Sequence, residues 1–202
     1  MKRRMVLLLA TVLSVVGLTM GHVGTAGAGS ATDIVKSKQS ALFDLIKQPS
    51  SAGNQKKIQA LFDEMLDYGA LAQASLGTEW AARSPEEQAE FSGVLKDLVR
   101  KAYEKNLKKT INFNIDYVGE EAAGSGVTVK TKATSKTNAR EEPIEIHFKM
   151  VEKNGQWRVN DIITEGVSLV SSYRSQFTKI VKKDGFPKLI EKMKKKLAAG
   201  EV

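Results

Sequence analysis

The chain contains no cysteine and only two histidines among its 202 residues. The lack of cysteine excludes disulfide bonds, thiolate metal sites, cysteine nucleophiles and lipid attachment at cysteine. The scarcity of histidine excludes metal centres that need several imidazole ligands. Because no disulfide closes a loop, the fold has to be stabilised by the packing of a sizeable core.

Few residues remain as candidates for catalysis. His22 lies in an N-terminal segment that we expect to be removed, and the alternating pattern around His147 turns its side chain away from the apolar face. No GxSxG, P-loop or GxGxxG motif follows a predicted strand. Asp161 and Glu165 leave carboxylate chemistry open, although two acids among 23 are a weak signal. The sequence therefore disfavours an enzyme and predicts no metal and no cofactor.

The N-terminus has the pattern of an export signal. Basic residues at positions 2–4 precede an uncharged apolar stretch from Met5 to Met20, and Ala26 and Ala28 have the spacing of a cleavage site. The apolar stretch is shorter than the roughly 20 residues that span a bilayer, which favours a cleaved signal over an uncleaved membrane anchor. We expect residues 1–28 to be a signal peptide and residues 29–202 to form a single domain.

The charge of the chain points to acidic partners other than nucleic acid. Loss of the three basic residues of the signal lowers the formal net charge from +8 to +5. For an exported protein, the expected acidic partners are phospholipid headgroups or acidic envelope proteins. Seven lysines near the C-terminus predict either a solvated helix face or an attraction to such partners. These lysines are Lys182, Lys183, Lys188, Lys192, Lys194, Lys195 and Lys196.

Hydrophobic periodicity predicts helices at both ends of the mature chain. Apolar residues recur every three or four positions in each of these segments. Ser84, Pro85 and Glu87 form a helix start signal in which a capping box precedes a long apolar stripe. The predicted helices cover residues 31–47, a segment around 58–66, 69–76, 85 to about 108, 167–181 and 186–197.

Between these helices the period of the apolar residues changes to two. Four short segments alternate between apolar and polar residues and are separated by turns rich in glycine and asparagine. The segments lie at residues 111–117, 127–133, 144–150 and 157–159. Helices followed by strands and again by helices predict an α+β fold, with a four-stranded antiparallel sheet covered by helices on one face.

The stretch from Trp157 to Phe177 carries a family resemblance. The pattern Trp157-x-Val159-x-Asp161 is similar to the last strand of cone-shaped folds like that of nuclear transport factor 2 (NTF2), and helices beyond that cone are expected. The whole stretch resembles the MlaC family, the periplasmic phospholipid-binding components of the Mla lipid-transport system, also known as toluene-tolerance auxiliary proteins of ABC transporters. The further residues that carry the resemblance are Glu165-Gly166-x-Ser168, Tyr173-Arg174-x-Gln176-Phe177, Leu76-Gly77-x-x-Trp80, Phe91 and Tyr103.

The resemblance implies a monomeric periplasmic carrier with phospholipid as its cargo. Such a carrier would shuttle lipid between inner-membrane MlaD-like and outer-membrane MlaA-like complexes, and it would need no catalytic group. Exposing a chain of roughly 16 carbons to water would cost on the order of 13 kcal/mol, so the lipid needs an apolar sleeve. A carrier of a different, hopanoid-type lipid and an NTF2-like small-ligand-binding protein or enzyme are the alternatives.

The expected lipid-binding residues are the apolar positions of the strands and of the helix that returns across them. A filled core would use the same residues, and the sequence leaves both interpretations open. The predicted lipid-binding residues are Phe113, Ile115, Tyr117, Val127, Val129, Ile144, Ile146, Phe148, Met150, Val167, Val170 and Phe177.

A polar pair is expected beside this apolar set. Asp161 has the strand parity of Trp157, so its carboxylate is expected to point inward. A buried carboxylate needs a partner, which Arg174 or Tyr173 can supply. We expect Asp161 and Arg174 to form a structural pair at the strand-to-helix corner, with contact to a lipid headgroup as the alternative.

Overall fold

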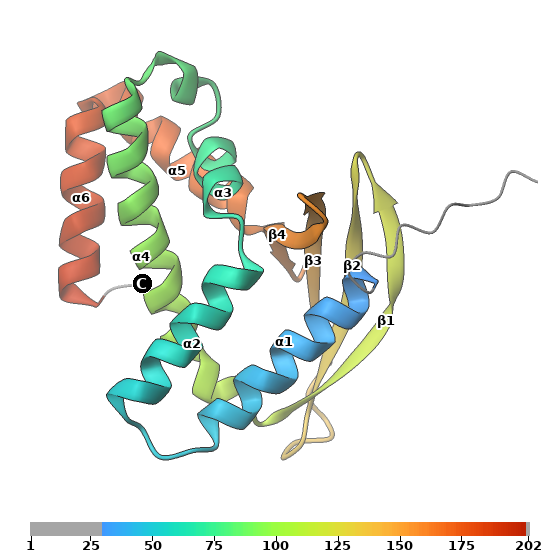
Figure 1. Cartoon of the computed structure of the whole chain (residues 1–202). Helices are drawn as coiled ribbons and strands as arrows, with labels where there is room; N and C mark the ends of the chain where they lie inside the picture. Colours follow the sequence, from blue (N-terminus) through green and yellow to red (C-terminus); the bar gives the residue numbers. More distant parts are fainter. Residues whose placement is uncertain (1–29, 201–202) are drawn as a thin grey trace, which may run out of the picture.

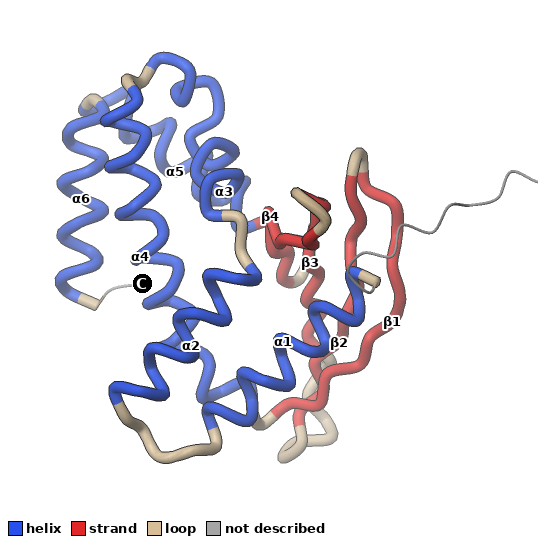
Figure 2. The backbone as a smooth tube through the Cα atoms, in the orientation of Figure 1, coloured by secondary structure: helices blue, strands red, loops and turns tan. Residues whose placement is uncertain are grey.

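The computed structural model describes residues 30–200, without the side chains of residues 105–109 (Figure 2). The predicted signal peptide, residues 1–28, lies outside the described residues. Among the described residues, no helix is both long enough and apolar enough to cross a membrane.

The described chain forms an open antiparallel sheet with helices on one side (Figure 1). The N-terminal helices are α1 (Ala31–Ile46), α2 (Ala52–Met65), α3 (Tyr68–Leu76), the 3-10 helix η1 (Gly77–Ala82) and α4 (Pro85–Thr110). The strands are β1 (Phe113–Ala123), β2 (Gly126–Ser135), β3 (Ile144–Lys153), β4 (Gln156–Thr164) and β5 (Val167–Ser168). The C-terminal helices are α5 (Leu169–Asp184) and α6 (Phe186–Ala199).

Side-chain caps begin the N-terminal helices where the sequence changes from loop to helix. The Oγ atoms of Ser30 and Ser51 accept hydrogen bonds from backbone amides in the first turns of α1 and α2. The capping box predicted for α4 is confirmed, because Glu87 N donates to Ser84 Oγ at 3.2 Å and Ser84 N donates to Glu87 Oε2 at 3.0 Å. These bonds satisfy amides that have no partner inside the helix.

The sheet confirms the predicted α+β class and the predicted antiparallel meander. Its strand order is β1-β2-β3-β4-β5, so each strand pairs with its neighbour in sequence. The β3–β4 turn places Asn154 and Gly155 at φ 53° and 73°, a pair of positive angles typical of a tight hairpin. The two-residue strand β5 was not predicted, and it extends the sheet beyond four strands.

Strand β5 also corrects the predicted start of the following helix. The helix expected from Val167 begins at Leu169, because Ser168 acts as its N-cap and accepts a hydrogen bond from Ser171 N. Val167 instead pairs with Thr164 in the sheet.

Two register shifts shape the sheet. One lies at Val118 in β1, between the pairs that Tyr117 and Gly119 form with β2. The other lies at Asn160 in β4, where Val159 pairs with Met150 and Asp161 pairs with Lys149. A bulge of this kind interrupts the alternation of side chains along one strand and bends it.

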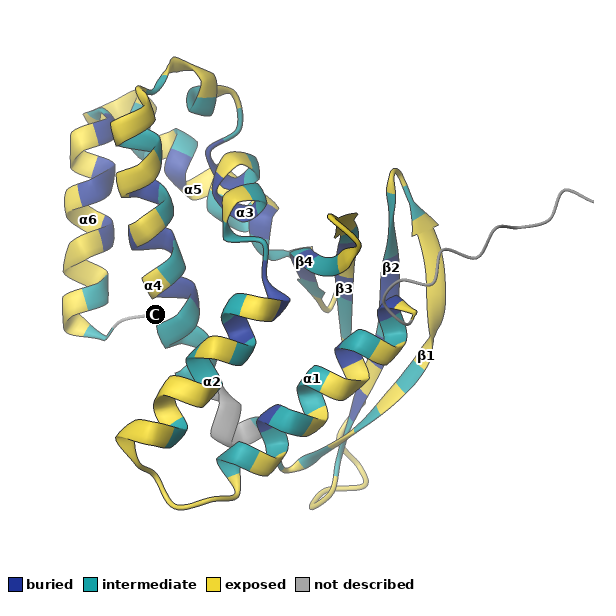
Figure 3. Cartoon of the chain, viewed as in Figure 1, coloured by how far each residue is buried: buried dark blue, intermediate teal, exposed yellow. Residues whose placement is uncertain are grey.

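The core lies between the sheet and the helices and continues into the helical part (Figure 3). Helix α1 packs on β1 and β2, while α2, α3 and α5 pack on β4. In the helical part, the Phe91 ring in α4 meets the Phe177 ring of α5 edge-on at 5.5 Å. Phe91 also lies 6.3 Å from the Phe186 ring of α6. The molecule thus has a helical layer whose own core joins that of the sheet.

Candidate functional site

The structure brings the nine predicted strand residues together on one face of the sheet. Cross-strand partners share a face, and the pairs link β1, β2 and β3 row by row. Tyr117 pairs with Thr131, and Thr131 with Ile146, in one such row. The other rows contain Ile115–Ala133–Ile144, Val129–Phe148 and Val127–Met150. Phe113 lies two positions before Ile115 in β1 and therefore shares its face. We call this surface the inner face, because it is the side on which the helices lie.

Burial across the inner face is uneven. Val129, Phe148 and Met150 at the centre of the sheet are at most 5% exposed. The remaining six predicted residues of the face are only half-buried: Phe113, Ile115, Tyr117, Val127, Ile144 and Ile146. The apolar surface is therefore packed at its centre and partly open toward β1 and the strand ends.

Helix α1 covers the β1 side of the inner face and is held there partly by polar contacts. The Tyr117 hydroxyl donates to Gln39 Oε1, and Thr32 N donates to Glu120 Oε1. Lys36 Nζ lies 6.0 Å from the centre of the Tyr117 ring. Burial raises the pKa of Tyr117 to about 12, so the hydroxyl stays protonated as a donor at neutral pH.

The three predicted residues outside β1, β2 and β3 do not join the inner face as one group. Val170 is 6% exposed at the start of α5, beside β4. Phe177 packs in the helical layer, where its ring stacks on Tyr173 at 5.2 Å and meets Phe91. Val167 lies in the edge strand β5, where it pairs with Thr164 and so ends the row of Ile146 on the inner face, and it is 61% exposed.

Asp161 is buried, but its partners differ from the predicted one. Its carboxylate accepts from Ser168 Oγ at 2.6 Å and from Val170 N at 3.1 Å, which ties the end of β4 to the first turn of α5. Arg174 Nε instead donates to the Ala74 carbonyl at 2.7 Å. The expected position of Asp161 at the corner is therefore right, and the expected partner Arg174 is wrong.

Arg174 lies across the end of α3 because a glycine leaves space for it. Gly77 has a φ of 61°, which is favourable for glycine at the end of a helix. A Cβ atom there would approach Arg174 Cδ to 3.3 Å. The two residues join α3 to α5 and take no part in binding Asp161.

The bulge in β4 adds an apolar residue that sequence parity missed. Ile162 pairs with Phe148 and is 6% exposed, so it continues the inner face where an unbroken strand would place Asp161. Periodicity alone gives no sign of the register shift at Asn160, because a bulge depends on the partner strand.

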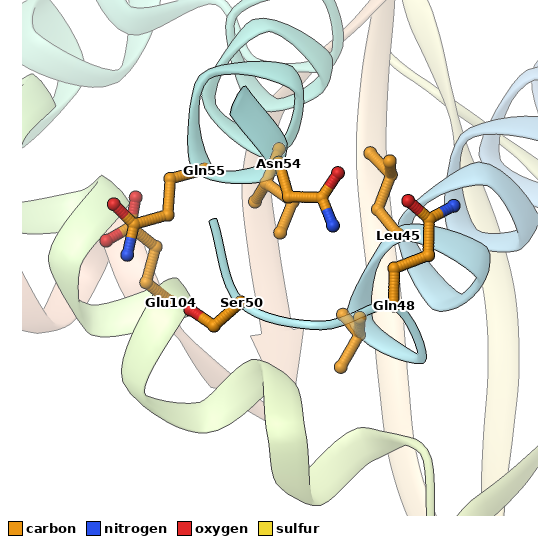
Figure 4. A pocket seen from close by; sticks show the side chains of 8 residues that line it. Leu45, Gln48, Ser50, Asn54, Gln55 and Glu104 are labelled. Atoms are coloured by element: carbon orange, nitrogen blue, oxygen red, sulfur yellow. The ribbon is translucent and has the colours of Figure 1, made fainter. Parts of the chain in front are cut away.

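A cavity of about 210 Å³ opens at the end of α1, next to α2 and α4 (Figure 4). Leu45 and Asn54 face one another across it, while Glu104 lies on the α4 side. The full lining is Leu45, Ile46, Gln48, Ser50, Asn54, Gln55, Ile58 and Glu104. Periodicity places its apolar members, Leu45, Ile46 and Ile58, on the apolar stripes of two predicted helices and gives no sign of a cavity between them.

A second cavity of about 230 Å³ lies between α4, α5 and α6 and has a largely apolar lining. Its lining residues include Tyr173, Phe177 and Met193 together with Lys192 and Lys196. Both cavities are smaller than the roughly 300–1,000 Å³ of typical small-molecule sites.

Within residues 30–200, no three His, Asp or Glu side chains come together as a metal site. What the structure offers is a continuous apolar surface on a sheet, beneath helices that are partly held by polar contacts. This arrangement defines an open-sheet α+β protein with an apolar inner face beneath its helices.

Comparison with known protein families assigns the chain to one of them. Residues 36–195 match the model of the MlaC protein family. The chain belongs to this family, as the resemblance of its C-terminal strand and helix had indicated.

Two relatives agree with the assignment. The chain is 26% identical over 120 residues to the intermembrane phospholipid transport system binding protein MlaC of Haemophilus influenzae. That match spans 58% of this chain and 56% of the relative, little more than half its length. The fold resembles a solved structure of the phospholipid-binding protein from Ralstonia solanacearum in complex with a phospholipid, with a TM-score of 0.73 and 23% identity. The match covers 86% of this chain and 100% of that structure.

Proposed function

We propose that the protein is a non-enzymatic carrier that binds the acyl chains of a phospholipid against the inner face of its sheet. The observation that carries the proposal is the apolar inner face in a chain of the MlaC family. The relative from H. influenzae is named for phospholipid transport, and the structure from R. solanacearum contains a phospholipid. An apolar surface shielded by helices meets the main physical need of a lipid that crosses water.

Binding a whole lipid requires the helices to move away from the sheet. The two cavities beside α4, of about 210 and 230 Å³, are too small for the acyl chains of a phospholipid. Helix α1 lies over the half-buried side of the face and is held there by hydrogen bonds from Tyr117 and to Glu120 and by the buried side chains of Val35 and Leu42; we propose that it is the element that moves. Such bonds can exchange with water at little net cost.

The proposed cargo site consists of the nine strand residues together with Val170 and Ile162. Phe177, also predicted from the sequence, packs in the helical layer and is assigned no contact with the cargo. Val167 ends the row of Ile146 at the exposed edge of the same face. Asp161 holds the corner beneath α5 and serves the architecture of the site.

The proposed setting is the periplasm, after removal of the signal peptide. There the protein would act as a monomer and exchange lipid with MlaD-like complexes of the inner membrane and MlaA-like complexes of the outer membrane. Those complexes would set the direction of lipid transport, because a carrier binds and releases its cargo through the same reversible contacts.

The test is to identify what the purified protein carries. The protein would be produced with its own signal, recovered from the periplasm, and extracted for lipid mass spectrometry. Phospholipid should be found, and after delipidation the protein should take up phospholipid from vesicles. Recovery of a polycyclic lipid in its place would favour the hopanoid-type alternative. If no lipid is recovered and the delipidated protein takes up none, the proposal fails.

A further inference from the structure

The outer surface of α5 carries a stripe of cations and hydroxyl groups. The stripe comprises Ser171, Arg174, Ser175, Thr178, Lys179 and Lys182, which recur at helical spacing and line an open groove of about 500 Å³. All of them except the half-buried Thr178 are exposed. The stripe contains neither an acidic nor a large apolar side chain. We call it the α5 stripe.

The cations of the α5 stripe are free to meet an external anion. Within residues 30–200, no carboxylate pairs with Lys179 or Lys182. On the neighbouring helix, by contrast, Lys192 Nζ lies 2.6 Å from Asp184 Oδ2 and Lys188 Nζ lies 2.7 Å from Glu191 Oε2. The Arg174 guanidinium is held in place by its bond to the Ala74 carbonyl. The stripe thus combines one positioned cation with two lysines that have no ion-pair partner among the described residues.

The stripe also lies in the positive part of the molecule. Residues 169–199, which form α5 and α6, contain nine basic and two acidic residues. Residues 30–168 contain 19 basic and 20 acidic residues, so this part is close to neutral. In Figure 1, α6 lies on the side of the helical layer away from β1. Charge separated in this way orients a protein toward an anionic surface as it approaches.

We propose that the α5 stripe is the surface by which the protein associates with an anionic phospholipid bilayer. Lysines and an arginine attract the phosphates, and hydroxyls from Ser171, Ser175 and Thr178 can donate to phosphate oxygens. The association goes beyond cargo binding, because the stripe lies on the outside of α5 and the cargo face is on the sheet.

The composition of the stripe favours a bilayer over a protein partner. Protein interfaces are depleted of lysine and are anchored by aromatic or other large side chains. The α5 stripe has no such anchor, and the exposed large apolar residues of the described chain, Val118 and Val167, both lie outside it. A lysine-rich face without an anchor produces an electrostatic attraction that salt weakens.

The test is sedimentation of the full chain with vesicles. At low salt the protein should sediment with phosphatidylglycerol vesicles and stay in solution with phosphatidylcholine vesicles. The variant K179Q/K182Q should lose on the order of 25-fold in partition, about fivefold for each lysine. Raising the salt to about 0.5 M should release the wild-type protein.

The matched control removes two positive charges at a different place on the surface. Lys56 and Lys57 are exposed on α2 and have no ion-pair partner among the described residues, so K56Q/K57Q should sediment like the wild type. Both double variants should keep phospholipid cargo, which separates this proposal from the carrier function. An equal loss of vesicle binding in K179Q/K182Q and K56Q/K57Q would overturn the proposal. Retention of the wild type, and not K179Q/K182Q, by a polyglutamate resin without vesicle binding would also overturn it and indicate an acidic protein partner.

Discussion

Asp161 shows how one carboxylate connects a strand to a helix. Its two oxygens accept from the Ser168 hydroxyl and the Val170 amide, so the side chain satisfies groups on both sides of the turn into α5. The residue is 7% exposed, and removing a buried acceptor leaves its donors without partners. The carboxylate therefore links β4 to the start of α5.

We predict that Asp161→Ala lowers the free energy of unfolding by about 3 kcal/mol, because two bonds to a buried charged group are lost. Asp161→Asn should cost less, since an amide oxygen can still accept from Val170 N. Urea unfolding followed by circular dichroism would measure both. Equal stability of Asp161→Ala and the wild type would contradict the role of the corner.

A double-mutant cycle with Arg174→Ala tests the partner assignment. Asp161 binds Ser168 and Val170 while Arg174 binds Ala74, so the two substitutions should be additive within about 0.5 kcal/mol. A coupling energy above about 1 kcal/mol would restore the pair that the sequence had suggested.

At the scale of elements, Asp63 joins α2 to α4. Its Oδ1 accepts from Arg100 Nε at 2.9 Å, and Lys96 Nζ lies 3.2 Å from its Oδ2. Burial alone raises the pKa of Asp63, but the bonds and charges of Arg100 and Lys96 outweigh it, and the pKa falls below the usual 3.8. The ionised carboxylate is thus the form that the folded state prefers.

The pKa shift predicts how this junction responds to acid. A lowered folded-state pKa contributes stability above the unfolded-state pKa near 3.8, and the contribution is lost as the pH falls through the folded-state value. Asp63→Asn should cost about 1 kcal/mol at pH 7, and the difference from wild type should shrink below pH 3.8. Chemical unfolding at several pH values measures this. A constant difference across the pH range would exclude the ion pair as its cause.

Elements with local signals were predictable from the sequence, and those that depend on a distant partner were not. The start of α4 follows from Ser84 and Glu87, which lie in one turn and bond to one another. The alternation in β1, β2 and β3 likewise identified the inner face. The bulge at Asn160 and the short strand β5 arise only when β4 pairs with its neighbours. Simple alternation along β4 therefore predicts Asp161 on the apolar face, whereas in the structure Ile162 takes that position.

At the scale of the whole molecule, the proposed cargo site lies between the sheet and the helices, so the two faces of the sheet should differ in lipid binding. Ile146 lies half-buried on the inner face, and Ile163 lies half-buried on the opposite face, one strand away. The two positions share residue type and burial and differ in the layer that they face. They form a matched pair for asking on which side the lipid binds.

Ile146→Trp should fill space beneath the helices and lower the phospholipid content of the purified protein several-fold. Ile163→Trp should leave the content unchanged, because its side chain faces away from the helices. Lipid phosphorus per mole of folded protein measures both, with thermal unfolding as the control for folding. Loss of lipid in Ile163→Trp alone would place the cargo on the other face.

The bulge at Val118 bears on whether copies of the protein can pair through the edge of their sheets at high concentration. Strand β1 runs over 11 residues at the edge of the sheet, and a long free edge invites strand pairing between copies. At its middle the bulge bends this edge, and Glu120 and Glu121 follow after Gly119. A second copy that tried to add its own β1 would meet a broken hydrogen-bonding register and like charges. Within residues 30–200 no strand pairs with this edge, and the bulge and the acidic residues oppose its extension by a second copy.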